Sequence, residues 1–502
     1  MMRLATFILA AMLAVGCGPV EKTEDGQSAL TRYADQLEKS GLVEKLDNMD
    51  QRLVAIEQSL TDLQKRGLTV VPPSPVQPVN VVPLSGPPDV VAVPTNPAPP
   101  VRVAPPFALT VPAPTQETTI VLWHAYRGQE KEAFEKTCAD FTAKFPTMVV
   151  TPQEVPFMAL RDKIVVTVPR GTGPDLFVYV HNPMGDWLRK GDILVPLSSY
   201  IEKFDSFDSL EKFIPDTVKA LAYDGTLYGL PLAFKARAMF YNKKLIKEVP
   251  TTVEALVRVA REATRGEGEE RVYGMLYEAG LLYHHAPWAH GFGATILDDA
   301  GRAQVNSEAF VRSVEMVRDW VKKDEILPDL NKDMAKFLFN NNQAGIVFKG
   351  PWFLGEIDEG IEYGVALLPD VAEGQPAKPY LGADGIYLAN CSQNKELAFQ
   401  VMRYLVSDEA AAVRYVEGGQ LVANSGLYDD KELSAKANPA LEVFRGQADN
   451  AVIISARPEM QAIWSTVDNA LRKIIFGDGA AQETLDEAQA KIEKDIASMG
   501  NQ

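Results

Sequence analysis

The sequence is poor in the features that mark several classes of protein. Only three cysteines occur among the 502 residues, which is too few for a disulfide scaffold. Basic residues are the minority, and the formal net charge of −17 argues against a nucleic-acid partner and against broad adhesion to an anionic membrane surface. Beyond the N-terminal leader, no apolar run is long enough to cross a membrane as a helix. Any transport pore must therefore belong to another chain.

Motifs of catalysis are also missing. The sequence contains no Gly-x-Ser-x-Gly, no His-Glu-x-x-His and no phosphate-binding Gly-Lys-Thr pattern. We therefore predict neither an enzymatic activity nor a cofactor. Two of the cysteines, Cys138 and Cys391, fall in the main body of the chain. Unpaired thiols are the simpler interpretation, but the spacing in sequence leaves a disulfide open.

The N-terminus has the pattern of a bacterial export signal. A positive start is followed by an apolar run, residues 4–16, that is too short to span a bilayer. The run ends at Cys17 and resembles a lipobox, in which the cysteine is diacylated, although the usual Leu three places earlier is here Ala14. Residues 1–16 are thus predicted to be a signal peptide and residues 17–29 a lipidated tether, which places the protein in the periplasm or elsewhere outside the cytoplasm. Ordinary signal cleavage beside a free cysteine is the alternative.

Residues 30–66 are predicted to form a helical stalk. The apolar residues from 42 onward step by alternating fours and threes: Leu42, Leu46, Met49, Leu53, Ile56, Leu60 and Leu63. This spacing is typical of a heptad seam, and opposite charges at the flanking positions favour a parallel coiled coil. We therefore expect a homo-oligomer through residues 42–66. A single amphipathic helix folded back on the main domain is the alternative.

Residues 67–117 are predicted to be a linker. The stretch from Val70 to Pro114 holds fifteen of the chain's 34 prolines and only two charged residues. Repeated proline excludes a helix or a sheet interior and favours extended polyproline II. At roughly 3.1 Å per residue, the segment could reach on the order of 100 Å. We interpret it as a semi-rigid spacer rather than as a docking site for a partner that recognises proline motifs.

A folded domain is predicted from residue 118 to residue 502. Residues 119–124, 148–155 and 175–180 are short apolar runs typical of strands, whereas residues 128–145 and 162–168 have helical spacing. The inward positions of the first helix are Ala133, Phe134, Thr137, Cys138 and Phe141. Alternating strands and helices favour a parallel, doubly wound α/β sheet, whose ligands bind where the strands end.

Several segments of this domain match one known family in the right order. They are Gly173-Pro174-Asp175, Asn182 to Trp187, Leu227 to Leu232, Phe240 to Leu245, Phe348-Lys349-Gly350-Pro351-Trp352, Tyr363 to Pro369, Asn394 to Ala398 and Pro458 to Trp464. The domain resembles the maltose-binding type of bacterial extracellular solute-binding protein over essentially the whole span from 118 to 502.

The resemblance implies an α/β fold of two lobes that close on a ligand by bending at hinge crossovers. It places lobe one at about 118–233 and 384–431 and lobe two at about 238–380 and 432–502. The crossovers are then expected near residues 234–237 and 380–384.

The resemblance also implies which residues hold the ligand. Trp352 and Trp464 match the family's sugar-stacking tryptophans, and Tyr179 stands at another aromatic position. Aromatic rings stack on the flat C–H faces of a sugar, while charged and amide groups bond to its rim of hydroxyls. Base rates alone would instead make each tryptophan a core residue.

The polar positions differ from the maltose-binding pattern. Asn182-Pro183 replaces an Asp-Arg pair, Lys235 replaces a cleft Glu, Arg127-Gly128 after Tyr126 replaces an Asp-Lys pair, and Asp468 replaces an Arg. Retained aromatic platforms with exchanged polar groups predict a carbohydrate other than maltodextrin. Arg127 and Lys235 would suit an acidic or phosphorylated sugar, unless they are solvated surface charges.

The histidines are a further candidate group. His124 and His181 end strands on the expected cleft side, and His284, His285 and His290 crowd the segment after Tyr283. Histidines can bind a transition metal, but no acidic residue lies among them at ligand spacing. We therefore predict no metal and count His181 and Tyr283 as candidate ligand contacts.

The predicted function is the extracytoplasmic substrate-binding component of an ABC importer. It would bind an oligosaccharide in a cleft between the lobes and deliver it to permease subunits in the membrane. The alternative is a ligand-binding sensor or scaffold lipoprotein that presents the same fold to a signalling partner, and the stalk motivates it. Loss of uptake on deletion of the gene would favour the first function, and intact uptake with a lost response would favour the second.

The heptad seam can be tested by substitution. Replacing Leu53 and Leu60 by Ser removes two apolar a positions, so an oligomer should become a monomer in sedimentation. A native protein that already sediments as a monomer would contradict the predicted coiled coil.

Overall fold

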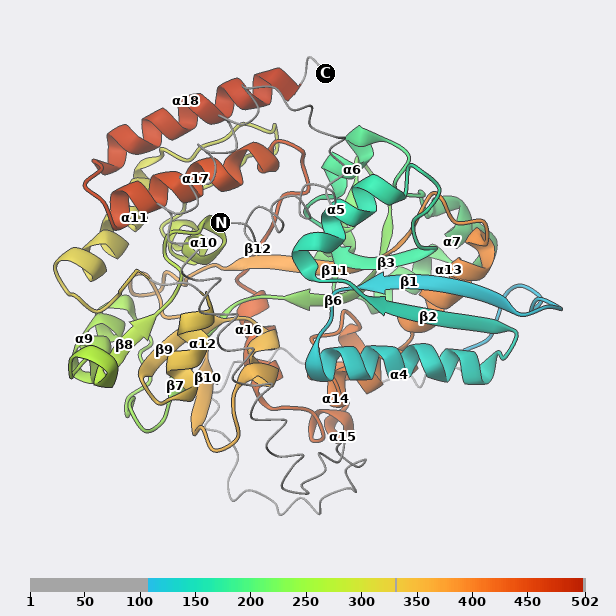
Figure 1. Cartoon of the computed structure of the whole chain (residues 1–502), viewed down its shortest axis with the longest axis horizontal. Helices are drawn as coiled ribbons and strands as arrows, with labels where there is room; N and C mark the ends of the chain where they lie inside the picture. Colours follow the sequence, from blue (N-terminus) through green and yellow to red (C-terminus); the bar gives the residue numbers. More distant parts are fainter. Residues whose placement is uncertain (1–106, 330–331, 500–502) are drawn as a thin grey trace, which may run out of the picture. The chain divides into compact units, whose positions relative to one another are not determined.

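The structure is a computed structural model that describes residues 107–329 and 332–499. All of these residues lie in one compact unit, which falls within residues 86–502. Within this unit the strands form a six-stranded sheet, a four-stranded sheet and a short hairpin (Figure 1). We call the six-stranded sheet with its helices the first lobe, and the four-stranded sheet with its helices the second lobe.

The first lobe contains most of the first half of the described chain and two later returns. Its elements are β1 (Thr118–His124), α4 (Gly128–Lys144), β2 (Met148–Glu154), α5 (Phe157–Thr167), β3 (Leu176–Val180), α6 (Met184–Lys190), α7 (Ser198–Phe204), η1 (Phe207–Lys212), α8 (Pro215–Ala220), β4 (Ala222–Tyr223), β5 (Thr226–Leu227), β6 (Gly229–Lys235), β11 (Tyr380–Leu388), α13 (Lys395–Leu405), α14 (Asp408–Val416) and β12 (Val452–Ile453).

The second lobe contains the middle of the chain and its C-terminal helices. Its elements are β7 (Ala238–Asn242), α9 (Val253–Ala263), η2 (Gly268–Glu270), β8 (Tyr273–Leu276), α10 (Leu282–Gly291), α11 (Glu308–Lys322), α12 (Lys332–Asn340), β9 (Ala344–Lys349), η3 (Pro351–Glu356), β10 (Tyr363–Ala366), α16 (Ala440–Ala448), α17 (Met460–Ile475) and α18 (Ala481–Met499), with η4 (Ser425–Tyr428) and α15 (Lys431–Ser434) leading into it.

The predicted strands and helices at the start of the domain are confirmed. β1, β2 and β3 occupy the three predicted runs, and α4 buries the five side chains that the helical spacing pointed inward. α5 begins at Phe157, five residues earlier than the spacing predicted. The earlier start is consistent with Pro156 at the N-cap, because proline is well tolerated where a helix begins.

The first sheet is mixed rather than wholly parallel. Its order is β12-β11-β3-β1-β2, with β6 paired to β11. β1 is parallel to β2 and to β3, as predicted, but β11 is antiparallel to both β3 and β6. The direction of β11 was not visible in the local sequence because this strand arrives from the second lobe, far along the chain.

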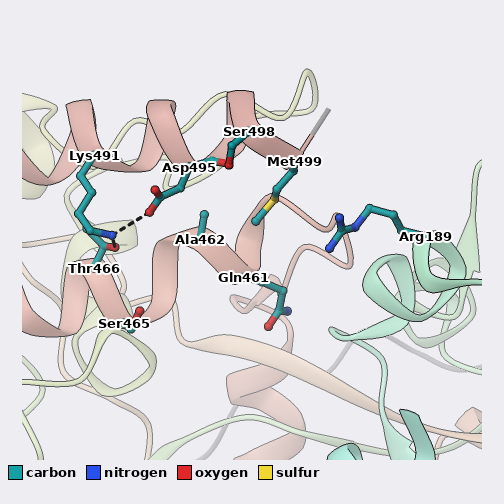
Figure 2. Close-up of a pocket in the computed structure, with 9 residues that line it drawn as sticks. All are labelled: Arg189, Gln461, Ala462, Ser465, Thr466, Lys491, Asp495, Ser498 and Met499. Atoms are coloured by element: carbon teal, nitrogen blue, oxygen red, sulfur yellow. Dashed lines mark hydrogen bonds and ion pairs between the residues drawn. The ribbon is translucent and has the colours of Figure 1, made fainter. Parts of the chain in front are cut away.

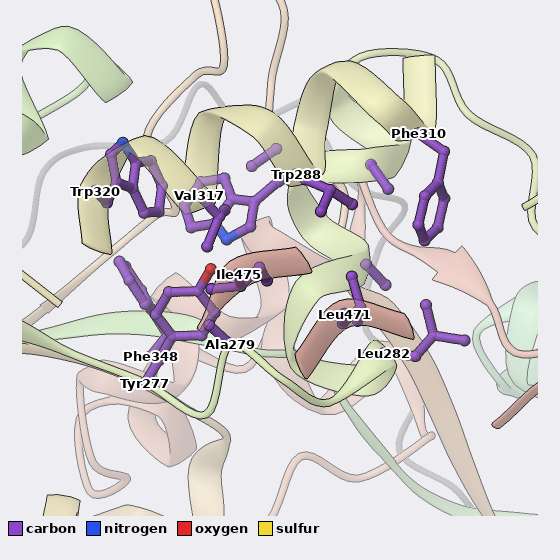
Figure 3. Packing of buried hydrophobic residues seen from close by; sticks show 14 of the residues in the cluster. Tyr277, Ala279, Leu282, Trp288, Phe310, Val317, Trp320, Phe348, Leu471 and Ile475 are labelled. Atoms are coloured by element: carbon purple, nitrogen blue, oxygen red, sulfur yellow. The ribbon is translucent and has the colours of Figure 1, made fainter. Parts of the chain in front are cut away.

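The second lobe has its own sheet and its own core. The strand order is β10-β7-β9-β8, in which only the β8–β9 pair is parallel. Trp288 lies at the centre of the core, edge-on to Trp320 and Phe348 with ring centroids 5.4 Å away in both cases (Figure 3). α17 adds Leu471 and Ile475 to the same cluster, which explains why the C-terminal helices return to this lobe.

Three strands connect the two lobes. β6 ends at Lys235 in the first sheet, and after two residues β7 begins in the second. β11 starts with Tyr380, whose ring packs in the core of the second lobe, and then continues into the first sheet. β12 pairs with the start of β11, where Tyr380 lies opposite Val452. Side chains at these connections are therefore within reach of both lobes.

The folded domain includes residues that composition assigned to the linker. Phe107 packs edge-on against Phe141, Phe145 and Tyr404, with the nearest ring centroid 5.2 Å away. Thr110 donates to the side chain of Gln400. The predictions for the signal peptide, Cys17, the stalk and most of the linker lie outside the described residues.

Two further predictions concern the cysteines and the length of apolar helices. Cys138 is buried and Cys391 is half-buried, and both thiols are free. In the part of the chain that the structure describes, no helix is long and apolar enough to cross a membrane.

Close packing of α9 on β8 makes one glycine indispensable. A Cβ added to Gly274 would lie 1.9 Å from the carbonyl oxygen of Ala260, so α9 would have to move. Gly274→Ala should lower the free energy of unfolding by about 1–3 kcal/mol, the usual effect of overpacking. Urea denaturation midpoints would measure this loss. Gly426→Ala is the matched control, because nothing lies within 4 Å of the added carbon; equal shifts for both variants would contradict the prediction.

Candidate functional site

A buried ion pair lies at the first connection between the lobes. The Nζ of Lys235, the last residue of β6, is 2.9 Å from Oδ2 of Asp384 on β11. The hydroxyl of Tyr126 donates to the same carboxylate oxygen at 3.2 Å, and Lys235 lies over the Tyr126 ring. Tyr126 and Asp384 are both buried. Two of the predicted site residues, Tyr126 and Lys235, are thus brought together by an aspartate that the sequence did not single out.

The surroundings of this pair fix its charge state. Burial alone would lower the pKa of Lys235, but the carboxylates of Asp384 and Glu130 raise it above its usual range. Burial is also the main reason that the pKa values of Tyr126 and Glu130 are raised. Lys235 therefore remains a cation whose charge is already balanced.

A second charged network lies on the other side of the crossover. Arg237 donates to Nε2 of His284 at 2.8 Å and to the carbonyl of Phe348 at 3.2 Å. Nδ1 of His284 is 2.6 Å from one oxygen of Glu278, and Lys349 donates to the other oxygen at 2.5 Å. Burial and the charge of Arg237 lower the pKa of His284 to about 3. The histidine is therefore neutral and links a guanidinium to a carboxylate.

The same geometry assigns the tautomer of His284. An arginine can only donate, so Nε2 must accept and the ring proton must lie on Nδ1, facing Glu278. Although burial would raise the pKa of Glu278, His284 and Lys349 lower it well below its usual range. Both cations of this network, Arg237 and Lys349, thus have polar partners within the protein.

Aromatic side chains continue from these networks into the second lobe. The guanidinium of Arg237 lies 5.0 Å from the centroid of the Tyr283 ring. Tyr283 is nearly parallel to Tyr380, and Tyr380 meets Trp464 of α17 at 5.8 Å. Asp468, one turn after Trp464, accepts from the backbone N–H of Leu282 at 2.7 Å and so ties α17 to the first residue of α10. Two more predicted residues, Tyr283 and Trp464, therefore share one aromatic row.

Trp352 approaches the site from β9. It follows Lys349 by three residues and lies in η3, half-buried, with its indole close to Gly350. A Cβ at Gly350 would be 2.0 Å from that ring, so the glycine is required for the placement of the indole. η3 lies against α4 of the first lobe. Trp352 thus occupies a position between the two lobes.

Tyr179 is covered by another aromatic residue. Its ring stacks on Phe157 with centroids 4.7 Å apart and planes 9° apart, and its hydroxyl donates to the Phe157 carbonyl. Only 5% of Tyr179 is exposed, against 47% of Phe157. The surface that a ligand could reach at this place belongs to Phe157. Local sequence gave little sign of it, because the residue falls in a stretch that the spacing left outside a helix.

Both ring nitrogens of His181 bond to the backbone. Its Nδ1 accepts from the N–H of Ala383 at 3.1 Å, and its Nε2 donates to the carbonyl of Ile454 at 2.7 Å. Burial lowers its pKa. The ring therefore joins β3, β11 and β12, and both nitrogens are occupied. Of the remaining predicted residues, Arg127 is exposed at the N-cap of α4 and Asn182 is half-buried before α6.

The other histidines are also engaged within the protein. His285 contacts the hydroxyl of Ser313 at 2.9 Å, and His290 contacts the carbonyl of Lys378 at 3.0 Å. Across the described ranges, no group of three His, Cys, Asp or Glu residues could hold a metal ion.

The residues that sequence reasoning missed are the charged partners. Asp384, Arg237, Glu278 and Lys349 complete the two networks. Arg237 and Asp384 lie within the two predicted crossovers, and Lys349 lies in a matched segment. Their position in or near the predicted crossovers and matched segments was the feature of the sequence that could have identified them as site residues.

Comparisons with known proteins agree with this architecture. The model of a family described as bacterial extracellular solute-binding protein matches residues 127–412. The chain is 27% identical over 366 residues to a maltotriose-binding protein of Pyrococcus abyssi, with 71% of this chain and 77% of that one covered. It is 25% identical over 358 residues to a galactooligosaccharide-binding protein of Bacillus subtilis, with 67% and 80% covered. A solved structure of a cyclo/maltodextrin-binding protein complexed with maltotetraose has a TM-score of 0.65 at 28% identity, with 77% of this chain and 99% of that chain covered.

The tautomers of two histidines provide a test of the site. His284 should carry its proton on Nδ1 and His181 on Nε2, and His284 should stay neutral down to a pH of about 5, because burial and the charge of Arg237 lower its pKa to about 3. Nitrogen chemical shifts of the ring atoms would report both features. His284 protonated on both nitrogens near pH 6 would contradict the network.

Acid should also weaken the fold through His284. The unfolded chain binds this proton below a pH of about 6.5, whereas the folded protein resists it until about 3, so stability is lost as the pH falls between these values. His284→Gln should reduce the slope of unfolding free energy against pH by up to about 1.4 kcal/mol per pH unit in that window.

Proposed function

We propose that this chain, which belongs to the family of bacterial extracellular solute-binding proteins, binds a neutral carbohydrate at the junction of its two lobes. The family and the relatives are binding proteins rather than enzymes, and so is this chain. We further propose that it delivers the carbohydrate to the permease of an ABC importer. The relatives named for maltotriose and galactooligosaccharide support the class of ligand.

One observation carries the proposal. Side chains from both lobes meet at the strand connections and combine hydrogen-bonding groups with aromatic faces. The first lobe contributes Tyr126 and Lys235, which contact each other. The second lobe contributes Tyr283 and Trp464, which both contact Tyr380. Aromatic rings suit the C–H faces of a sugar, and the polar groups suit its hydroxyls. A ligand held by residues of both lobes would favour their closed arrangement.

The balance of charge favours a neutral sugar over an acidic one. Lys235 is paired with Asp384, Lys349 with Glu278, and Arg237 faces the neutral His284. At Lys235 and Lys349, a carboxylate or phosphate on the ligand would have to compete with the carboxylate that each lysine already binds. A hydroxyl can instead accept or donate one hydrogen bond while the ion pairs remain in place.

The remaining parts of the chain suit a role outside the cytoplasm. We propose lipid anchoring at Cys17, oligomerisation through residues 42–66 and presentation of the domain on the proline-rich spacer. The lipobox-like end of the leader, the heptad seam and the fifteen prolines between Val70 and Pro114 support these proposals.

Calorimetric titration of the purified protein with neutral oligosaccharides tests the function. The panel should include maltose- and galactose-based series and a uronic-acid oligosaccharide as the acidic comparison. We expect the native protein to bind a neutral sugar and to change its tryptophan fluorescence on binding. Trp464→Ala and Trp352→Ala should each lower the affinity about tenfold, because each substitution removes one stacking surface.

The matched control is Phe337→Ala. Phe337 on α12 is 62% exposed, and its ring takes no part in the contacts of the site. The Phe337→Ala variant should bind the sugar with the same affinity as the native protein. Binding of the acidic oligosaccharide alone, or of no sugar at all, would contradict the proposed ligand class.

A further inference from the structure

A polar groove lies between the lobes, apart from the junction described above. It has a volume of about 360 Å³, within the range of small-molecule sites. One wall is Arg189 of α6 in the first lobe, and the other wall and the floor come from α17 and α18 of the second lobe (Figure 2). Figure 2 shows Arg189 extending from α6 toward these two helices. The groove therefore depends on how the two lobes meet.

A backbone hydrogen bond and an ion pair hold the first wall in place. The N–H of Gly185 in α6 donates to the carbonyl of Ala456 at 3.0 Å, just before α17. Any side chain at Gly185 would collide with that carbonyl, since an added Cβ would be 2.3 Å from the oxygen. Arg189 is then oriented by Asp186, whose carboxylate it reaches at 3.1 Å.

The second wall offers unmet hydrogen-bonding capacity. The Nε2 of Gln461 is buried and has no partner among the described residues. Lys491 is satisfied by Thr466 at 3.1 Å and Asp495 at 2.7 Å, so it contributes a neutral pair. The hydroxyl of Ser498 donates to the Asp495 carbonyl, which leaves its oxygen free to accept. The wall thus presents both donors and acceptors.

The floor of the groove is apolar. Ala462 of α17 and the thioether of Met499 in α18 line it between the polar groups. An apolar floor surrounded by alternating donors and acceptors matches a sugar ring, which has C–H faces and hydroxyl edges. Arg189 shares the Asp186 carboxylate with Lys190, and the remaining N–H groups of its guanidinium can donate to adjacent hydroxyls of a ligand in the groove.

The groove adjoins the aromatic row through α17. Gln461 and Trp464 are three residues apart on this helix and are therefore neighbours on its surface. Trp464 packs toward Tyr380, and Gln461 lines the groove. A chain of sugar units that stacks on Trp464 can continue past this turn of the helix.

We propose that the groove is an outer carbohydrate subsite, which holds a sugar unit beyond those bound at the junction. This inference rests on the proposed function, because it extends the same ligand. Arg189 and Gln461 donate to the hydroxyls of that unit, and Ala462 with Met499 supports its C–H face. The protein would then favour longer oligosaccharides over short ones.

Calorimetric titration of full-length variants with ligands of different length tests the subsite. The probes are maltotriose and maltoheptaose, with a trisaccharide and a hexasaccharide of galactose in parallel. Gln461→Leu keeps the volume of the side chain and removes its amide, and Arg189→Met keeps the stem and removes the guanidinium. Each should weaken binding of the longer ligand about fivefold, the effect of one lost hydrogen bond, and leave the trisaccharide within about twofold.

The control is Lys190→Met. Lys190 pairs with Asp186 at 2.9 Å, as Arg189 does, but it does not line the groove. Lys190→Met should leave the affinities for the short and the long ligand unchanged. Equal weakening of short and long ligands by the groove variants, or no effect on either, would overturn the subsite while the junction site stands. A native protein that binds none of the four sugars would overturn the proposed function and the subsite together.

Discussion

The ion pair between Lys235 and Asp384 is the constraint on which the site depends. Both residues lie on neighbouring antiparallel strands at the place where the chain passes between lobes. Removing either partner would leave the other charge in a buried place, which is costly by several kcal/mol. The pair also holds the hydroxyl of Tyr126 and so joins β1 to the crossover. With this charge balanced internally, the junction can present polar groups without demanding a charged ligand.

The second network repeats this arrangement with a different linking group. Neutral His284 accepts from Arg237 and faces Glu278, and Glu278 is in turn held by Lys349. These contacts fix the segment that carries Tyr283, while Asp468 fixes the start of the following helix from α17. These contacts hold in place the segments that carry Tyr283 and Trp464. Rigid aromatic surfaces lower the entropy lost on binding, which favours affinity for a weakly polar sugar face.

Local pattern predicted a large part of the fold. The five buried side chains of α4 and the first three strands followed from the spacing of apolar residues. What local pattern could not supply was pairing across the chain. Tyr126 and Asp384 are 258 residues apart, and no periodicity links them. Tyr179 was assigned correctly to a strand end, but only the structure shows that Phe157 covers its ring. His181 lies where a ligand contact was predicted, but its two ring nitrogens bond to backbone groups of Ile454 and Ala383.

A crystal structure of the protein grown with a neutral oligosaccharide would test the central claim most directly. We expect density for sugar rings against Trp464 and Tyr283, with Trp352 on the opposite side and the Lys235–Asp384 pair intact. A ligand bound away from these aromatic residues would contradict it, as would an acidic group of the ligand that displaces Asp384 from Lys235.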